Sequence, residues 1–253
     1  MSVRIIAIIN QKGGVGKTTT TANLTYALAK VGKKVTVVDF DPQGHLAISL
    51  GLFSKQHVGI DAVMLGEASL EEVIIPMREN LQLVPAGTKL QDIELLNDGG
   101  VQRGDLLRKA LSNSFQDQDF VFIDCPPSSG LLVANVLFAT EEILIPMASD
   151  FMALQGLSHL METIRKFEKV LKKTYKTQLV ISRYTASRRL SKEVVAKLQH
   201  YFPKQILATV IRETALLAEC PSFGKTILEY RPSSPSARDF HDLASDFLIG
   251  KVM

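Results

Sequence analysis

The feature that most constrains the fold is a glycine- and lysine-rich segment, residues 10–19, placed between an apolar run and a helical pattern. The run, residues 3–9, is nearly continuous and rich in β-branched side chains, which is typical of a strand buried on both faces of a parallel sheet. The segment 18–31 then carries apolar residues at helical spacing, from Ala22 to Val31, and Gly32 is placed to end that helix. A glycine-rich loop between a strand and a helix can turn backbone N–H groups toward an anion, so the segment predicts a phosphate site.

The loop also supplies the other two groups that a nucleotide phosphate site needs, a lysine at Lys17 and a hydroxyl for Mg²⁺ at Thr18. The strict pattern G-x-x-x-x-G-K-S/T fails at its first position, Gln11, and a second lysine stands at Lys12. Lys12 stands five residues before Lys17, too far along the turn to serve the phosphates that Lys17 would bind in any obvious way. One use for Lys12 is to reach the nucleotide of a neighbouring subunit. The alternative for the whole loop is a glycine-rich turn without a ligand. The expected nucleotide-binding residues here are Lys12, Gly13, Gly14, Val15, Gly16, Lys17, Thr18 and Thr19.

Carboxylates follow two further strand-like runs. Residues 34–39 end in Asp39, and Asp41 follows in a stiff loop, where it is expected to orient water or Mg²⁺. The alternative is ordinary turn chemistry, because Asp-Pro and Gln-Gly are common loop signals. Residues 120–124 end in Asp124, and nucleotide hydrolases with a phosphate loop use such an aspartate to hold the Mg²⁺ shell. Apolar strands that end in Asp are common in parallel sheets, so Asp124 indicates a metal site only in combination with the other motifs.

Strand-like and helical segments alternate along the sequence. Further strands are expected at 81–85, 143–146, 179–182 and 206–211, and helices at 104–111, 131–139, 154–171, 191–202 and 235–249. This alternation predicts an α/β fold, a doubly wound, mostly parallel twisted sheet with helices on both faces and ligands at the carboxyl ends of the strands. No linker divides the 253 residues, so we expect a single domain over residues 1–253.

Composition and charge narrow the setting. No window reaches the ~18 uncharged apolar residues of a membrane span, and the apolar start runs into the glycine-rich loop instead of a cleavage site, so a cytoplasmic location is expected. Two cysteines cannot supply a disulfide framework or a four-ligand zinc site. The net charge of +3 predicts no partner, but residues 165–204 carry twelve basic and two acidic residues. That segment is a candidate surface for a polyanion.

Together these motifs resemble the ParA branch of the ParA/MinD ATPases, the deviant Walker A family. The similarity covers essentially the whole chain and implies the P-loop NTPase form of the fold. The small, Soj-like form without an N-terminal DNA-reading domain is the closest match, because the first strand begins at Val3. The matching segments are KGGVGKTT (12–19), DFDPQG (39–44), IDCPPS (123–128), ALQGL (153–157) and ECPSFGK (219–225).

The resemblance implies a weak, Mg²⁺-dependent ATPase that forms a sandwich dimer around two ATP molecules. Lys12 would cross to the phosphates of the partner subunit's nucleotide, and Lys17 would bind the β- and γ-phosphates of its own. Thr18 would ligate Mg²⁺, Asp124 would hold the metal through water, and Asp41 would position the attacking water. The ATP-bound dimer would bind non-specific DNA, and a ParB-like or cargo-adaptor protein would stimulate hydrolysis. Repeated cycles would move a chromosome or plasmid centromere complex, or another large cargo, over the nucleoid.

One loop departs from the family pattern. The family often carries Pro-Arg-Asn-x-Arg-Leu-Ser-Glu-Ala-Pro before its last strand, whereas residues 212–221 read RETALLAECP. Glu213 and Leu216 remove two positive charges, so DNA contact is expected from the basic segment instead. The alternative for those basic residues is a solvated helix face. The expected DNA-binding residues are Arg188, Arg189, Lys192, Lys172 and Lys173.

Two other protein classes share parts of this pattern. A MinD-like membrane-associated positioning ATPase should end in a basic amphipathic helix, but residues 235–253 hold two basic and three acidic residues, and their Phe/Leu stripe is more simply core. An electron-transfer relative such as the nitrogenase iron protein needs cysteines at a subunit interface, and Cys125 and Cys220 form no C-x-x-C pair. The ATP-switched DNA-binding dimer is therefore the leading interpretation.

Overall fold

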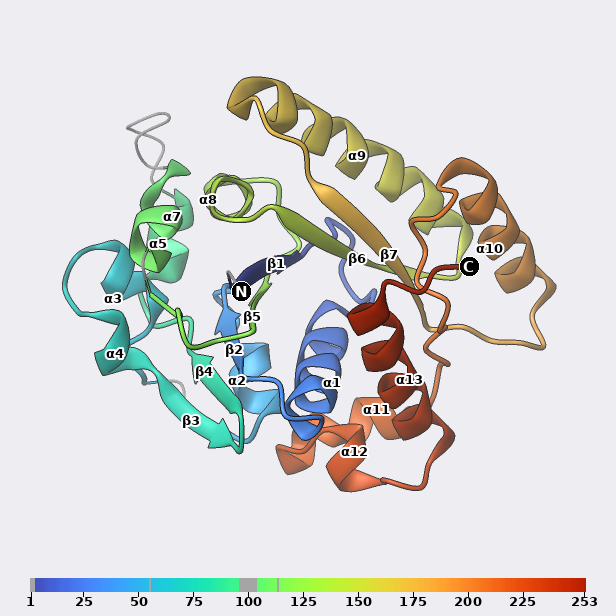
Figure 1. The fold of residues 1–253 in the computed structure, drawn as a ribbon, viewed down its shortest axis with the longest axis horizontal. Helices are drawn as coiled ribbons and strands as arrows, with labels where there is room; N and C mark the ends of the chain where they lie inside the picture. Colours follow the sequence, from blue (N-terminus) through green and yellow to red (C-terminus); the bar gives the residue numbers. More distant parts are fainter. Residues whose placement is uncertain (1–2, 55, 96–103, 113) are drawn as a thin grey trace.

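The computed structural model describes residues 3–54, 56–95, 104–112 and 114–253. Within these residues seven strands form one sheet in the order β3-β4-β2-β5-β1-β6-β7, and the β3–β4 pair is antiparallel while the other pairs are parallel (Figure 1). The expected doubly wound, mostly parallel sheet is thereby confirmed. The strands are β1 (Arg4–Ile8), β2 (Val35–Asp39), β3 (Ile75–Arg78), β4 (Leu81–Val84), β5 (Phe120–Asp124), β6 (Glu142–Ala148) and β7 (Lys176–Ser182).

Helices cover both faces of this sheet, because alternate residues of its central strands point to opposite sides. Ala7 and Ile9 join one buried cluster and Ile6 and Ile8 the other. The first cluster includes residues of α3, α4, α5, α7, α8, α9 and α10, and the second includes residues of α1, α2, α12 and α13 (Figure 1). The helices are α1 (Lys17–Lys30), α2 (His45–Ser49), α3 (Ile60–Met64), α4 (Leu70–Val73), α5 (Leu90–Leu95), α7 (Leu106–Leu111), α8 (Leu131–Ala139), α9 (Phe151–Leu171), α10 (Arg189–Tyr201), α11 (Ala215–Glu219), the 3₁₀ turn η1 (Cys220–Phe223), α12 (Ile227–Tyr230) and α13 (Pro235–Ile249).

The register of the central strands brings their carboxyl ends to one edge of the sheet. Ile8 of β1 pairs with Asp124 of β5, and Asp124 pairs with Asp39 of β2. The loops that follow these three strands therefore meet at this edge, where ligands bind in open α/β sheets.

One expected strand is absent from the described residues. Residues 206–211 lie beside β7 but meet it only at isolated backbone hydrogen bonds, such as Leu207 N–H to the carbonyl of Leu179 at 2.9 Å and Ile211 N–H to the carbonyl of Ile181 at 2.7 Å. Ile206, Leu207 and Ile211 of this run are buried by packing, so its hydrophobicity is not evidence of a continuous ladder. The other six expected strands and the six expected helices are confirmed, each end lying within three residues of its expected position.

The structure also contains elements that the apolar pattern did not predict. The edge strand β3 contains Pro76, which lacks the N–H that an interior strand would use, and it has only four residues. Short helices such as α2 and α12 have too few residues for helical periodicity to be recognised. In the part of the chain that the structure describes, we find no helix with the length and apolar character needed to cross a bilayer.

Candidate functional site

The glycine-rich loop between β1 and α1 is held open by its glycines and supported from β7. Gly14 and Gly16 have φ angles of 72° and 85°, in the left-handed region that favours glycine. The Ser182 hydroxyl donates to the carbonyl of Val15 at 2.7 Å, and the Arg183 guanidinium donates to the carbonyl of Gly14 at 3.0 Å. The end of β7 therefore positions the loop, a contribution that nothing in the local sequence indicated.

The Lys17 side chain lies at the bottom of this loop and is buried. Its Nζ donates to the carbonyl of Lys12 at 3.4 Å, a weak contact for a buried ammonium. Burial lowers the pKa of Lys17, and the nearby carboxylates of Asp124 and Asp41 oppose that shift. A buried cation is stable only with a counter-charge, so the loop is suited to receive an anion.

Asp124, at the end of β5, binds two threonine hydroxyls of α1. The Thr18 hydroxyl donates to Oδ2 at 2.8 Å and the Thr21 hydroxyl to Oδ1 at 2.9 Å. Burial raises the pKa of Asp124 to about 6, although both hydrogen bonds and the charge of Lys17 act to lower it. Thr18 and Asp124 thus offer two oxygen atoms beside the loop, the number and type that Mg²⁺ takes from protein when phosphates supply further ligands. Thr21 was not expected to take part, although it lies one turn after Thr18 on the same helix.

The two aspartates after β2 have different environments. Asp39 is fully buried, accepts the N–H groups of Ala47 at 3.0 Å and Asp41 at 3.3 Å, and therefore fixes both α2 and the Asp41 turn. Burial raises the pKa of Asp39 well above its ordinary value, and the adjacent Asp124 adds to this effect. Asp41 is only half-buried, and its Oδ1 accepts the N–H of Gln43 at 3.0 Å. Of the two, Asp41 is therefore the carboxylate that a water or substrate can reach.

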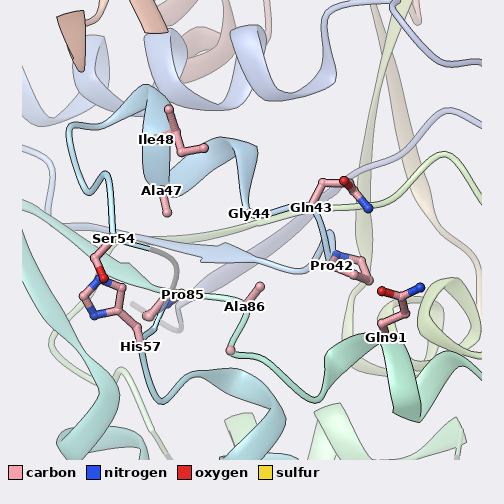
Figure 2. Close-up of a pocket in the computed structure, with 11 residues that line it drawn as sticks. Pro42, Gln43, Gly44, Ala47, Ile48, Ser54, His57, Pro85, Ala86 and Gln91 are labelled. Carbon is pink, nitrogen blue, oxygen red and sulfur yellow. The ribbon is translucent and has the colours of Figure 1, made fainter. Parts of the chain in front are cut away.

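Two hollows flank this edge of the sheet. A cleft of about 340 Å³ extends from the phosphate loop between the end of β7 and the segment leading into α11, and its lining includes Gly14, Arg183 and Glu213. Its position beside the loop allows it to hold the base and ribose of a nucleotide. The second hollow, of about 220 Å³, lies behind the Asp41 turn, between residues 42–44, Ala47 of α2 and the segment after β4 (Figure 2). None of the described residues that line the second hollow is Asp, Glu, Lys or Arg.

Lys12 is anchored at both its backbone and its side chain. Its N–H donates to Oδ1 of Asn10 at 2.9 Å, and the Asn10 amide in turn donates to the carbonyl of Pro146 at 2.8 Å. Its Nζ lies 2.7 and 2.8 Å from the two carboxylate oxygens of Asp150, between β6 and α9. Asp150 was not among the expected site residues, although an aspartate before a helix is a recognisable N-cap signal.

The expected DNA-binding residues form two separate groups. Arg188, Arg189 and Lys192 are exposed and follow β7, at the carboxyl edge of the sheet beside the phosphate loop. Lys172 and Lys173 precede β7 and lie at the opposite edge. Seven residues of extended strand, roughly 20 Å at 3.3 Å per residue, separate them. The basic segment is therefore not one continuous surface.

Lys173 differs from the other four basic residues because it is turned inward. Its Nζ donates to the carbonyl of Thr140 at 2.7 Å and lies 4.7 Å from the ring centroid of Tyr175. Burial lowers the pKa of Lys173. Because the Lys173 side chain is occupied by these contacts within the chain, its position conflicts with the expectation that it contacts DNA. Lys172, by contrast, is exposed.

The divergent loop 212–221 adds a negative charge next to the basic residues. The Glu213 carboxylate pairs with Arg183 at 2.7 Å and with Arg188 at 3.4 Å. The Arg212 guanidinium is directed to Asp239 of α13 at 2.7 Å. Glu213 therefore partly neutralises two of the arginines nearest the phosphate loop.

The sequence of this chain is similar to a known domain family and to chromosome-partitioning proteins. A family model described as an AAA domain matches residues 3–179. The chain is 38% identical over 247 residues to the sporulation initiation inhibitor protein Soj of Bacillus subtilis, covering 96% of this chain and 97% of Soj. It is 36% identical over 247 residues to the chromosome-partitioning ATPase Soj of Thermus thermophilus, covering 97% and 96%.

Among solved structures, a cobyrinic acid a,c-diamide synthase from Mycobacterium smegmatis with bound ATP analogue and magnesium is similar at a TM-score of 0.81. Its sequence is 30% identical, and the match covers 97% of this chain and 94% of that one. The phosphate loop, the aspartates at the strand ends and these full-length similarities lead to one assignment. The chain belongs to the ParA/Soj family of chromosome-partitioning ATPases.

Proposed function

We propose that this protein is an ATP-switched dimer that binds DNA without sequence preference and partitions a cargo when a partner protein stimulates hydrolysis. The observation that carries the proposal is the buried Lys17 next to the Thr18–Asp124 hydrogen bond of 2.8 Å, beneath a loop with a second lysine. These are the groups needed to hold a nucleoside triphosphate with its metal ion.

ATP binding rests on the loop and the cleft beside it. Lys17 would bind the β- and γ-phosphates, and the backbone N–H groups of residues 13–19 would carry the remaining phosphate charge. Thr18 would ligate Mg²⁺ directly and Asp124 through water, in agreement with the oxygen pair that the two side chains offer. When bound, Mg²⁺ supplies electrostatic stabilisation to the transferring phosphoryl group. The ATP analogue and magnesium in the Mycobacterium smegmatis protein support this part of the proposal.

Hydrolysis requires a group that orients water toward the γ-phosphate, and we assign this role to Asp41. Its carboxylate is half-buried and held in a tight turn at the edge that carries Lys17. Asp39, by contrast, is enclosed and acts by fixing that turn. A single accessible carboxylate in a fixed turn is suited to accept a proton from water or to align it.

Dimerisation is assigned to Lys12, which would leave Asp150 and reach the nucleotide of the partner subunit.

DNA contact is assigned to Arg188, Arg189 and Lys192, because they lie at the same edge of the sheet as the nucleotide. Two copies joined at that edge would bring two such groups together, which increases the number of phosphate contacts and makes binding depend on ATP. With these assignments, the protein would be cytoplasmic and would bind and leave the nucleoid in cycles. A ParB-like protein or another cargo adaptor would be its activator.

The decisive experiment measures association and DNA retention together. With ATP and Mg²⁺ the wild-type chain should sediment as a dimer and retard random-sequence DNA at low salt, and with ADP it should do neither. Lys12→Ala should bind a fluorescent ATP analogue normally, yet remain monomeric and fail to retain DNA. A wild-type chain that binds anionic liposomes with ATP but not DNA would instead indicate a membrane-associated positioning ATPase.

A further inference from the structure

The first turn of α9 exposes two consecutive large apolar side chains, Phe151 and Met152. They are 61% and 59% exposed, and among the exposed large hydrophobic residues of the described segments no other two are adjacent in sequence. Single exposed apolar residues are normal on a protein surface, whereas clustered ones mark binding sites, and Phe and Met are enriched at protein interfaces. This turn therefore carries the features of a contact surface.

The core of this protein does not use these two side chains. Ala153 and Leu157 anchor the start of α9, since both are buried in the cluster on that face of the sheet. Phe151 and Met152 come before this buried face and project from the end of the helix. Helical periodicity predicts a start at residue 154, because the exposed first turn does not share the apolar pattern of the packed face.

The turn lies next to Lys12, the lysine that the proposed function directs to the nucleotide of the partner subunit. Asp150 directly precedes Phe151, and its carboxylate binds Lys12 Nζ at 2.7 and 2.8 Å. The same carboxylate accepts the N–H of Ala153 at 2.9 Å, so Lys12 and the first turn of α9 are tied to one group. Figure 1 places this turn at the end of β6, on the edge of the sheet that carries the phosphate loop.

We propose that Phe151 and Met152 form an apolar contact between two copies of this chain in the ATP-bound dimer. This inference rests on the proposed function, in which Lys12 reaches the partner subunit's phosphates. For that to happen, the partner must approach within one lysine side chain of Asp150, and a subunit at that distance covers the adjacent residues 151 and 152. In a two-fold dimer the contact occurs twice, once from each copy. Flexible Met and flat Phe side chains are well suited to such packing.

The test replaces both apolar side chains and compares them with a matched position on the same helix. Phe151→Ser with Met152→Ser should raise the dissociation constant of the dimer at least tenfold in sedimentation with a non-hydrolysable ATP analogue and Mg²⁺. Val170→Ser is the control, since Val170 is 70% exposed near the other end of α9 and should leave the constant unchanged. Affinity of the monomer for a fluorescent ATP analogue should stay within twofold in both variants, which shows that the site is folded.

A second measurement leaves the surface nearly intact. The photoreactive residue p-benzoylphenylalanine at position 151 should give a dimer-sized cross-link with the ATP analogue and none with ADP. A wild-type chain that stays monomeric with the analogue would overturn the proposed function itself. A wild-type dimer that the double variant forms equally well, without a cross-link, would overturn this inference alone. A double variant that dimerises normally but loses stimulation by its activator would also overturn it, because the contact would then belong to that activator.

Discussion

Lys12 Nζ lies 2.7 and 2.8 Å from the two carboxylate oxygens of Asp150, a residue 138 positions away in the sequence. The pair is partly exposed, with 34% and 45% of the two side chains accessible to solvent. Partly exposed ion pairs of this kind contribute only about 0–1 kcal/mol. The contact is therefore strong enough to direct Lys12 inward and weak enough for a nucleotide phosphate to replace it.

Asp150→Asn should make dimerisation easier. Asparagine keeps the hydrogen bond that caps α9 but removes the charge that holds Lys12. Each subunit of the proposed dimer releases one such pair, so the ATP-dependent dimer should form at a concentration up to about 30-fold lower. Sedimentation with ATP analogue and Mg²⁺ measures this shift. Glu67→Gln is a suitable control, because it removes a similarly exposed ion pair, with Lys89, away from the site. Equal or weaker dimerisation of Asp150→Asn would show that Asp150 does not compete for Lys12.

Lys17→Ala should lose affinity for ATP. Hydrogen bonds from a charged donor contribute about 1.5–3 kcal/mol, so the dissociation constant should rise by about 10- to 100-fold. The variant should remain folded, because burial already disfavours the charged form of Lys17 and lowers its pKa. Titration with a fluorescent ATP analogue tests this, with Lys33→Ala, a partly exposed lysine beyond the end of α1, as control. Unchanged affinity in Lys17→Ala would remove the phosphate-site assignment.

Asp41→Ala should separate hydrolysis from binding. Loss of a residue that aligns or deprotonates the attacking water should slow phosphate release at least about 100-fold while ATP still binds. The slow variant should then accumulate as a dimer in ATP and Mg²⁺. Gln43→Ala leaves the Asp41 carboxylate in place and should hydrolyse ATP at close to the wild-type rate. Normal turnover by Asp41→Ala would transfer the assignment to another group.

Asp124 should make the stability of the nucleotide-free protein depend on pH. Its pKa is about 6 in the folded chain and near the ordinary 3.8 when unfolded, so the folded state holds the proton more tightly. The free energy of unfolding should therefore rise as the pH falls from 7 through 6, and level off below about 4.

Asp124→Asn tests this linkage. The rise in the pKa of Asp124 from 3.8 to about 6 corresponds to about 3 kcal/mol of lost stability at neutral pH. The asparagine should recover this free energy, less what it loses in hydrogen bonds to Thr18 and Thr21. The variant should gain stability relative to wild type at pH 7.5, and the gain should shrink at pH 5. Urea denaturation at both pH values measures the difference. A gain that does not change between pH 7.5 and pH 5 would show that Asp124 is ionised at both.

DNA binding should depend on the edge of the sheet that carries the nucleotide. Reversing Arg188 and Arg189 to Glu should lower affinity for random DNA, and the slope of log affinity against log salt should flatten by roughly 0.9 for each DNA phosphate that the variant no longer neutralises. Lys169→Glu with Lys172→Glu changes as much charge at the opposite edge and should retain binding. ATP affinity should be normal in both double variants. A loss of binding confined to the second pair would place DNA on the opposite edge.

The sequence by itself determined the features that depend on short stretches of chain. Left-handed glycines next to a lysine and a threonine define a phosphate loop wherever a strand precedes and a helix follows, and residues 10–19 meet that condition. The apolar run that ends at Asp124 predicted both the strand and its terminal carboxylate, because a strand buried on two faces has a continuous apolar pattern. The alternation of such runs with helical patterns was enough to predict the mostly parallel sheet.

Only the tertiary structure decided which distant groups meet at the site. Strand register placed Asp39 beside Asp124, and their mutual burial made Asp39 a support for the turn instead of an accessible acid. The support of the phosphate loop by Ser182 spans 167 residues, and the pairing of Lys12 with Asp150 spans 138. Local pattern carries no information about such interactions, because they depend on strand order and on which side chains a fold leaves without a nearer partner. For the same reason one basic segment in the sequence became two groups, one at each end of β7.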